Sequence, residues 1–258
     1  MAAFAVLGIV ILAVWGWQTL RPQTPESGEI TLKTPEVKEV KIEEDTPQYH
    51  IAASYPEFHN LGDPIRETAA NNLIKSKVQQ SIDSLKSASE EAIEISPEIK
   101  SELQLDYEVV HINSSVASIK MRESTYVEGA AHPLGIFWPF NYNFKDNKEI
   151  ALADLFKPGS NYLEVLSNLS REILEGPLYD YEYYDEEAVK FGTAPEPENF
   201  STFFLARDKL IIIFNVYQIS PYAVGPKIIE IPYEELNEPP DGRVSIINQE
   251  GLIKLIRE

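Results

Sequence analysis

The feature that most constrains the fold is a run of alternating large side chains near the middle of the chain. Every second residue is large and apolar, in the order Ile136, Trp138, Phe140, Tyr142 and Phe144. Side chains two positions apart lie on the same face of a β-strand. The pattern therefore predicts a strand with one buried face, and such a strand needs a sheet around it.

Other periodic segments fill the chain after residue 46. Apolar residues spaced three to five apart predict a helix from Pro64 to about Glu91, capped by Asp63. A second helix is predicted after Pro158, ending at Gly176. Because hairpin-length connections predominate, we expect an α+β fold with mostly antiparallel sheets and packed helices in two joined modules. Strands, hairpins or a closing helix are predicted for residues 48–58, 102–112, 115–127, 149–156, 201–219, 225–236 and 249–258.

The first twenty residues, Met1–Leu20, contain no charge and are long enough to cross a bilayer as a helix. Trp15 and Trp17 stand near the end of this span, where aromatic rings favour the membrane interface. A cleaved signal peptide is the alternative, although its basic start and its small-residue cleavage site are not evident. We expect an uncleaved, single-pass anchor in a cell membrane with the body extracytoplasmic. Arg21, read alone by the positive-inside rule, would favour a cytoplasmic body.

The predicted anchor is followed by a segment of different composition. Residues 21–46 are rich in Pro, Thr and Glu and are interpreted as a tether, in which residues 31–44 could add an edge strand. We place the two α+β modules at residues 47–150 and 151–258.

The charge and cysteine content exclude several kinds of protein. Lys and Arg total 22 against 41 Asp and Glu, which gives a net charge of −19 and argues against a nucleic-acid partner. The chain has no cysteine, so disulfides, cysteine-ligated metals and thiol nucleophiles are excluded. No two of the four histidines stand at metal-ligand spacing, and the common catalytic motifs are missing. We therefore assign no catalytic residue, metal or cofactor.

The turn before the alternating strand holds the first candidate site residue, His132. As a site, His132 would form a polar cluster with Tyr126 and Glu128. As structure, Gly129 and Pro133 bracket a tight turn in which the imidazole bonds to neighbouring backbone. The turn is the favoured interpretation, and a place in a ligand groove stays open.

An acidic, tyrosine-rich segment, residues 179–187, is the second candidate. It holds five carboxylates and four tyrosines in nine residues, which suits a contact surface for a cationic partner. A calcium site and an acidic helix start are the alternatives. The candidate contact residues are Tyr179, Asp180, Tyr181, Glu182, Tyr183 and Tyr184, and the carboxylates available to calcium are Asp180, Glu182, Asp185 and Glu186.

The third candidate is Tyr222, which stands in a bent loop between two apolar strands. Pro221, Gly225 and Pro226 fix the course of that loop. A loop that only reverses the chain is the more economical interpretation.

Three blocks, residues 129–156, 162–169 and 203–236, together resemble the RsiV-like extracytoplasmic domains. The most specific parts are the Gly-x-Ala-His-Pro turn at residues 129–133 and the Pro-Tyr-Ala-x-Gly-Pro loop at residues 221–226, and the resemblance covers about Tyr49 to Leu236. That family includes lysozyme-sensing anti-sigma factors and accessory domains of peptidoglycan deacetylases. The resemblance implies an α+β body displayed outside the membrane.

The resemblance also shapes the expected function. We see neither a segment before the anchor for holding a sigma factor nor a histidine-rich catalytic domain, so we expect the binding or sensing domain alone, without catalysis. The implied partners are a basic protein such as lysozyme or a peptidoglycan fragment, and the acidic surplus suits the former. A glycan-acting enzyme of the envelope and a passive scaffold are the alternatives.

Overall fold

The computed structural model describes residues 31–92, 100–176, 185–237, 246–248 and 250–258. These residues fall into one compact unit, Thr31–Glu258. Among them, no helix combines the length and the apolarity needed to cross a bilayer. The predicted anchor, Met1–Leu20, lies outside the described residues.

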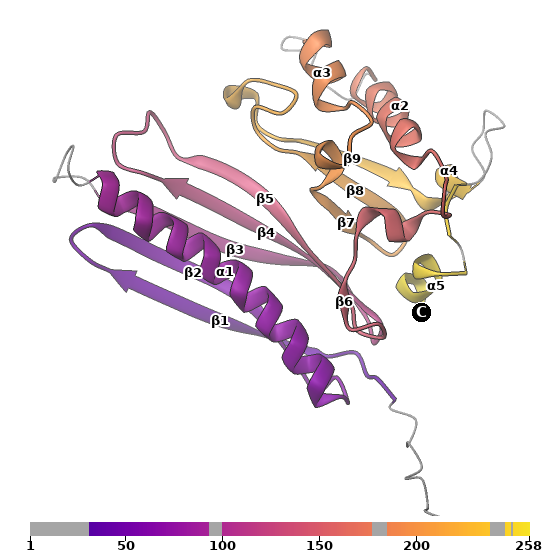
Figure 1. Ribbon diagram of the computed structural model, residues 1–258, viewed down its shortest axis with the longest axis horizontal. Coiled ribbons are helices and arrows are strands. Elements are labelled where there is room, and N and C mark those ends of the chain that lie inside the picture. The colour runs from indigo at the N-terminus through magenta and orange to yellow at the C-terminus, as the bar shows by residue number, and fades with distance from the viewer. Residues whose placement is uncertain (1–30, 93–99, 177–184, 238–245, 249) are drawn as a thin grey trace, which may run out of the picture. The chain divides into compact units, whose positions relative to one another are not determined.

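The first sheet has six strands in chain order (Figure 1). All neighbouring strands are antiparallel except β2 and β3, which are parallel and are connected through the long helix α1. The elements are β1 (Glu36–Asp45), β2 (Tyr49–His59), α1 (Pro64–Ala92), β3 (Ser101–Ile112), β4 (Val116–Tyr126), β5 (Leu134–Asn143) and β6 (Lys148–Glu149).

Helix α1 covers one face of this sheet (Figure 1). Its buried residues Ala70, Ile74, Val78 and Ile82 recur every four positions, the spacing of one helix face. The predicted cap is confirmed, because the Asp63 carboxylate accepts hydrogen bonds from the first backbone N–H groups of the helix.

The alternating segment forms a strand, as predicted. Phe140, Tyr142 and Phe144 are buried in the core beneath α1, and Trp138 is half-buried at its edge. The Phe140 ring stacks on Phe58 of β2, with ring centroids 5.9 Å apart. The opposite face is buried as well at Asn141 and Asn143, so the prediction of a single buried face was wrong for the end of β5.

The tether prediction was wrong for Glu36–Asp45. These residues form β1, which pairs along the length of β2 and packs Val37, Val40 and Ile42 against the first core. The edge-strand alternative is confirmed, because alternating half-buried apolar residues outweigh the charged composition of the segment.

The second sheet has three antiparallel strands in the order β7, β8, β9. It belongs to a second core together with four short helices. The elements are α2 (Tyr162–Leu174), α3 (Glu186–Gly192), β7 (Phe203–Leu205), β8 (Lys209–Phe214), β9 (Lys227–Pro232), α4 (Tyr233–Asn237) and α5 (Leu252–Arg257). The α+β class is confirmed, and the division into two modules stays a prediction.

Two buried polar side chains join the sheets. Ser118 of β4 donates to Asn141 of β5 over 2.7 Å, and both side chains are buried. The Asn141 amide donates to the Phe203 carbonyl over 2.8 Å, and the Leu205 N–H donates to Ser118 over 2.9 Å. Both backbone groups lie on β7, which uses them to attach to the first sheet. Buried polar groups require such partners, so this network specifies how β7 is placed.

Asn215 makes a second connection. Its side chain accepts from the Phe137 N–H over 2.8 Å and donates to the Phe137 carbonyl over 2.9 Å. The amide thereby pairs with both backbone groups of one residue of β5 and holds the segment after β8 against that strand.

His111 gives the fold a pH dependence. Its Nε2 is buried and has no hydrogen-bond partner among the described residues. Burial lowers the pKa of His111 below its ordinary value of 6.5, and Arg207 lowers the pKa further, while a backbone hydrogen bond to Ile256 opposes both. The unfolded chain therefore binds a proton more readily than the folded chain does.

We expect the free energy of unfolding to fall as the pH drops below about 6.5 and to level off below the folded-state pKa. Urea titrations from pH 7.5 to pH 5, on the wild type and on His111→Gln, would measure this. Because glutamine takes up no proton, the stability difference between the two proteins should change over that window. An unchanged difference would contradict the assignment.

Candidate functional site

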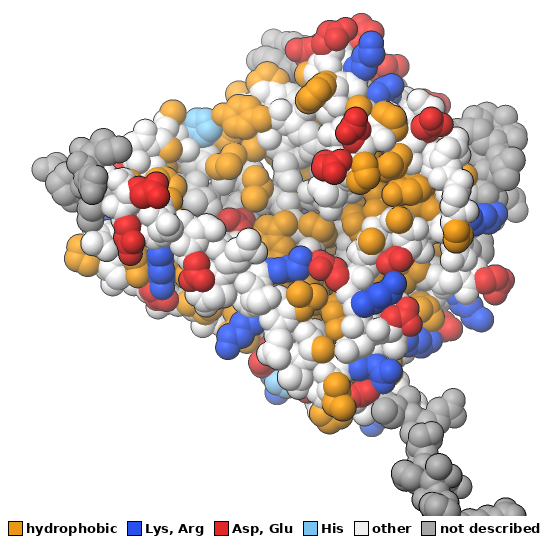
Figure 2. All heavy atoms as spheres, viewed as in Figure 1, with side chains coloured by type: hydrophobic (Ala, Val, Ile, Leu, Met, Phe, Trp, Pro, Cys, Tyr) orange, Lys and Arg blue, Asp and Glu red, His pale blue; other side chains and the backbone are white. Residues whose placement is uncertain are grey.

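Three aromatic side chains from distant segments meet on the surface and are called the aromatic platform, consisting of His132, Tyr217 and Tyr222. The His132 and Tyr222 rings stack with centroids 3.8 Å apart. The Tyr217 ring lies 6.4 Å from His132 and 5.7 Å from Tyr222. Tyr217 is 59% exposed and the His132 side chain is also exposed. Figure 2 shows hydrophobic side chains beside a histidine on one face of the molecule.

Two tight turns put the His132 and Tyr222 rings in place. The first, before β5, is closed by a hydrogen bond from the Ala130 N–H to the Val127 carbonyl. The second is a single helical turn, Tyr222–Val224, which ends at Gly225. Gly225 has φ of 75°, a conformation that glycine adopts without a steric penalty. Each turn therefore has a local sequence cause.

The Pro133 carbonyl organises the polar atoms of the platform. It accepts from the Tyr222 hydroxyl over 2.7 Å and from His132 Nδ1 over 2.9 Å. Because a carbonyl only accepts, Nδ1 carries a hydrogen. In the neutral ring, Nε2 then accepts from the Tyr217 hydroxyl, 3.0 Å away. The arrangement ties the imidazole to both tyrosines, to Tyr217 by a direct hydrogen bond and to Tyr222 by stacking and the shared Pro133 carbonyl.

Tyr217 has an unusual backbone conformation for an aromatic residue. Its φ is 68°, in the left-handed region that side chains with a Cβ rarely adopt. The turn is closed by the Gln218 N–H, which donates to the Asn215 carbonyl over 3.0 Å. Strain of this kind is concentrated at functional sites, which makes Tyr217 a candidate in its own right.

The structure brings together two of the predicted site residues, His132 and Tyr222, which are 90 positions apart. The ring nitrogens of His132 bond to Pro133 and Tyr217, not to the predicted partners Tyr126 and Glu128. The polar cluster was the less favoured alternative, and Pro133 and Tyr217 occupy both nitrogens in its place. The bond from Nδ1 to the Pro133 carbonyl is the neighbouring-backbone contact of the turn interpretation.

Tyr217 was missed by sequence reasoning. It follows a buried strand and carries no turn signal, because tyrosine is not a residue that favours positive φ. Only its position in an exposed turn after β8 distinguishes it.

The candidate residues Tyr179–Tyr184 lie outside the described residues. The carboxylates that follow form the start of α3, where Asp185 accepts from the N–H groups of Glu187 and Ala188. Acidic groups at this position stabilise a helix start. In the ranges that the structure describes, no cluster of three or more acidic or histidine side chains is arranged to hold a metal ion.

Comparison with known proteins relates the chain to a peptidoglycan deacetylase and to a family of unknown function. A family model described as "Deacetylase PdaC" matches residues 42–135, and one described as "Protein of unknown function (DUF3298)" matches residues 153–234. The peptidoglycan-N-acetylmuramic acid deacetylase PdaC of Bacillus subtilis is 29% identical over 187 residues, which are 72% of this chain. The comparisons support a peptidoglycan-deacetylase-related family. The chain spans 38% of the length of that deacetylase.

Two crystal structures of DUF3298 family members share the fold. The protein from Bacteroides fragilis has a TM-score of 0.60 and 18% identity, and the match covers 88% of this chain and 98% of that one. The protein from Pseudomonas aeruginosa has a TM-score of 0.56 and 16% identity, with 84% and 95% covered. At this identity the likeness establishes the mixed α+β fold of this chain and nothing about its ligand.

Proposed function

We propose that the chain is a non-catalytic recognition module of the cell envelope that binds peptidoglycan through the aromatic platform. The observation that carries the proposal is the convergence of His132, Tyr217 and Tyr222 on an exposed surface. Exposed aromatic rings held in fixed orientations lose little entropy on binding and offer both apolar faces and polar edges.

The relationship to a peptidoglycan deacetylase supports the ligand class. A protein whose partner is peptidoglycan acts outside the cytoplasm, so we place the body in the envelope. We propose that Met1–Leu20 anchors it to the cell membrane as a single uncharged span.

A basic protein such as lysozyme is the second candidate ligand. The net charge of −19 favours it, because opposite charges accelerate encounter and improve specificity. Binding driven in this way weakens as salt rises. A glycan-acting enzyme is less well supported, since the ring nitrogens of His132 contact a carbonyl and a tyrosine hydroxyl and no carboxylate.

Sedimentation of the purified protein with insoluble peptidoglycan tests the proposal. We expect Tyr222→Ala to weaken binding about tenfold or more, because the residue supplies a stacked ring and a hydroxyl at the centre of the platform. Ile65→Ala is the control, since it removes an apolar side chain that is 77% exposed on α1.

Equal binding by wild type and a folded Tyr222→Ala protein would contradict the platform. Salt-sensitive binding to lysozyme, without sedimentation on peptidoglycan, would identify a basic protein as the ligand instead of peptidoglycan.

A further inference from the structure

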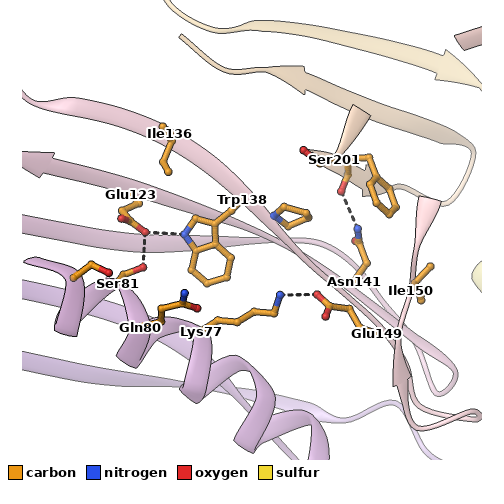
Figure 3. A pocket seen from close by; sticks show the side chains of 13 residues that line it. Lys77, Gln80, Ser81, Glu123, Ile136, Trp138, Asn141, Glu149, Ile150 and Ser201 are labelled. Carbon is orange, nitrogen blue, oxygen red and sulfur yellow. Dashed lines mark hydrogen bonds and ion pairs between the residues drawn. The ribbon is translucent and has the colours of Figure 1, made fainter. Parts of the chain in front are cut away.

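A groove between α1 and β5 is the second surface that can hold a ligand, and it is called the Trp138 groove. Its cavity has a volume of about 510 Å³, within the usual range for ligand sites. Lys77, Gln80 and Ser81 line it from α1, and Ile136 and Trp138 line it from β5 (Figure 3). Ser84 of α1 also lines the cavity.

Trp138 is held in a fixed orientation at this groove. Its Nε1 donates to the Glu123 carboxylate over 2.9 Å, and Ser81 donates to the same oxygen over 2.7 Å (Figure 3). The only polar group of the indole is therefore satisfied inside the protein. The half-buried ring is left to make apolar contacts.

Two uncharged polar side chains of the groove are free. Among the described residues, Gln80 and Ser84 have no side-chain hydrogen-bond partner. They are four positions apart on α1 and therefore point to the same side. The charged groups are already engaged, since Lys77 pairs with Glu149 at 2.7 Å.

The hollow continues along the helix. A second depression over α1 shares Gln80 and Ser84 with the first and extends to Glu91. The surface is thus elongated, and it suits a chain-like ligand better than a compact one.

We propose that the Trp138 groove binds a glycan chain, with a sugar ring on the Trp138 indole and its hydroxyl or acetamido groups on Gln80 and Ser84. A sugar ring presents an apolar C–H face and a rim of neutral donors and acceptors. The groove offers the complement of both, and its charges are paired within the protein. The inference rests on the proposed envelope location but uses none of the platform residues.

Intrinsic fluorescence tests the groove directly. The chain has three tryptophans, Trp15, Trp17 and Trp138, so the full chain carrying Trp15→Phe and Trp17→Phe reports on Trp138 alone. This protein, kept soluble in mild detergent, is titrated with a chitin oligosaccharide. We expect a saturable change in emission.

Variants then assign the contacts. Gln80→Ala and Ser84→Ala should each weaken binding about fivefold through loss of a hydrogen bond. Asn72→Ala, an exposed position of α1 outside the groove, is the matched control and should bind like the parent. Tyr222→Ala should also bind the oligosaccharide like the parent.

The outcomes separate the two proposals. The absence of an emission change would overturn glycan binding in the Trp138 groove. So would an emission change that is the same in Gln80→Ala and Ser84→Ala. Both conclusions hold even if the protein still sediments with peptidoglycan through Tyr222. Oligosaccharide binding that depends on Gln80, with sedimentation that does not depend on Tyr222, supports the groove and overturns the platform.

Discussion

Replacing Asn141 by leucine should lower the free energy of unfolding by about 3 kcal/mol, because the change leaves buried polar groups without partners. The Phe203 carbonyl would lose its donor and Ser118 would lose its acceptor, at positions that exclude water. Leucine branches at the same carbon as asparagine but carries bulkier methyl groups, so the loss combines the missing hydrogen bonds with overpacking of the buried site. Urea unfolding followed by circular dichroism would give the value.

A matched control and a double-mutant cycle make the test specific. Asn72→Leu, at an exposed position of α1, should change stability by less than about 0.5 kcal/mol. Ser118→Ala should also destabilise, since it removes the acceptor of the Leu205 N–H. The double variant should cost less than the sum of the single ones, as expected for one connected network. Additive losses of stability would contradict a single network formed by Ser118 and Asn141. So would a loss for Asn141→Leu as small as that of the control.

Replacing Tyr217 by asparagine should separate binding from stability. Asparagine tolerates positive φ better than tyrosine does, so we expect the free energy of unfolding to stay level or rise by up to about 1 kcal/mol. The tyrosine side chain is 59% exposed, so its interactions contribute little to folding and their removal is offset by the relief of strain. Binding to peptidoglycan should nevertheless fall about tenfold, because the Tyr217 ring and its hydrogen bond to His132 are removed.

Thermal unfolding and sedimentation with peptidoglycan measure the two effects on the same preparations. Tyr217→Phe is the control for the hydroxyl, since it keeps both the ring and the strained backbone. A Tyr217→Asn protein that loses stability and keeps full binding would contradict the assignment of Tyr217 as a strained residue that contacts the ligand.

Local patterns were enough to predict most of the elements. The alternation through Phe140 and Tyr142 and the four-residue spacing of Ile74 and Val78 depend only on which face of an element is buried. The pairing of strands that lie far apart in the sequence was harder to predict. The parallel contact of β2 with β3 depends on the return path of α1, and the residues of β1 carry a charged composition that also suits a tether.

The candidate site shows the same limit. His132 and Tyr222 stand in turns whose Gly and Pro residues are visible in the sequence. Their contact could not be predicted, because it depends on Asn141 and Asn215 holding the second sheet against β5. The contribution of Tyr217 depends on a backbone conformation that its residue type does not favour.

The most direct test of peptidoglycan recognition is nuclear magnetic resonance of the histidine rings during titration with soluble peptidoglycan fragments. The chain has four histidines, and a His132→Gln variant assigns the signal of His132. In the free protein we expect the His132 signal to show a hydrogen on Nδ1, which donates to the Pro133 carbonyl. On addition of fragments its resonances should shift and saturate, while those of His50 and His59 on β2 stay in place. An unchanged His132 signal in the presence of bound fragments would contradict recognition by the aromatic platform.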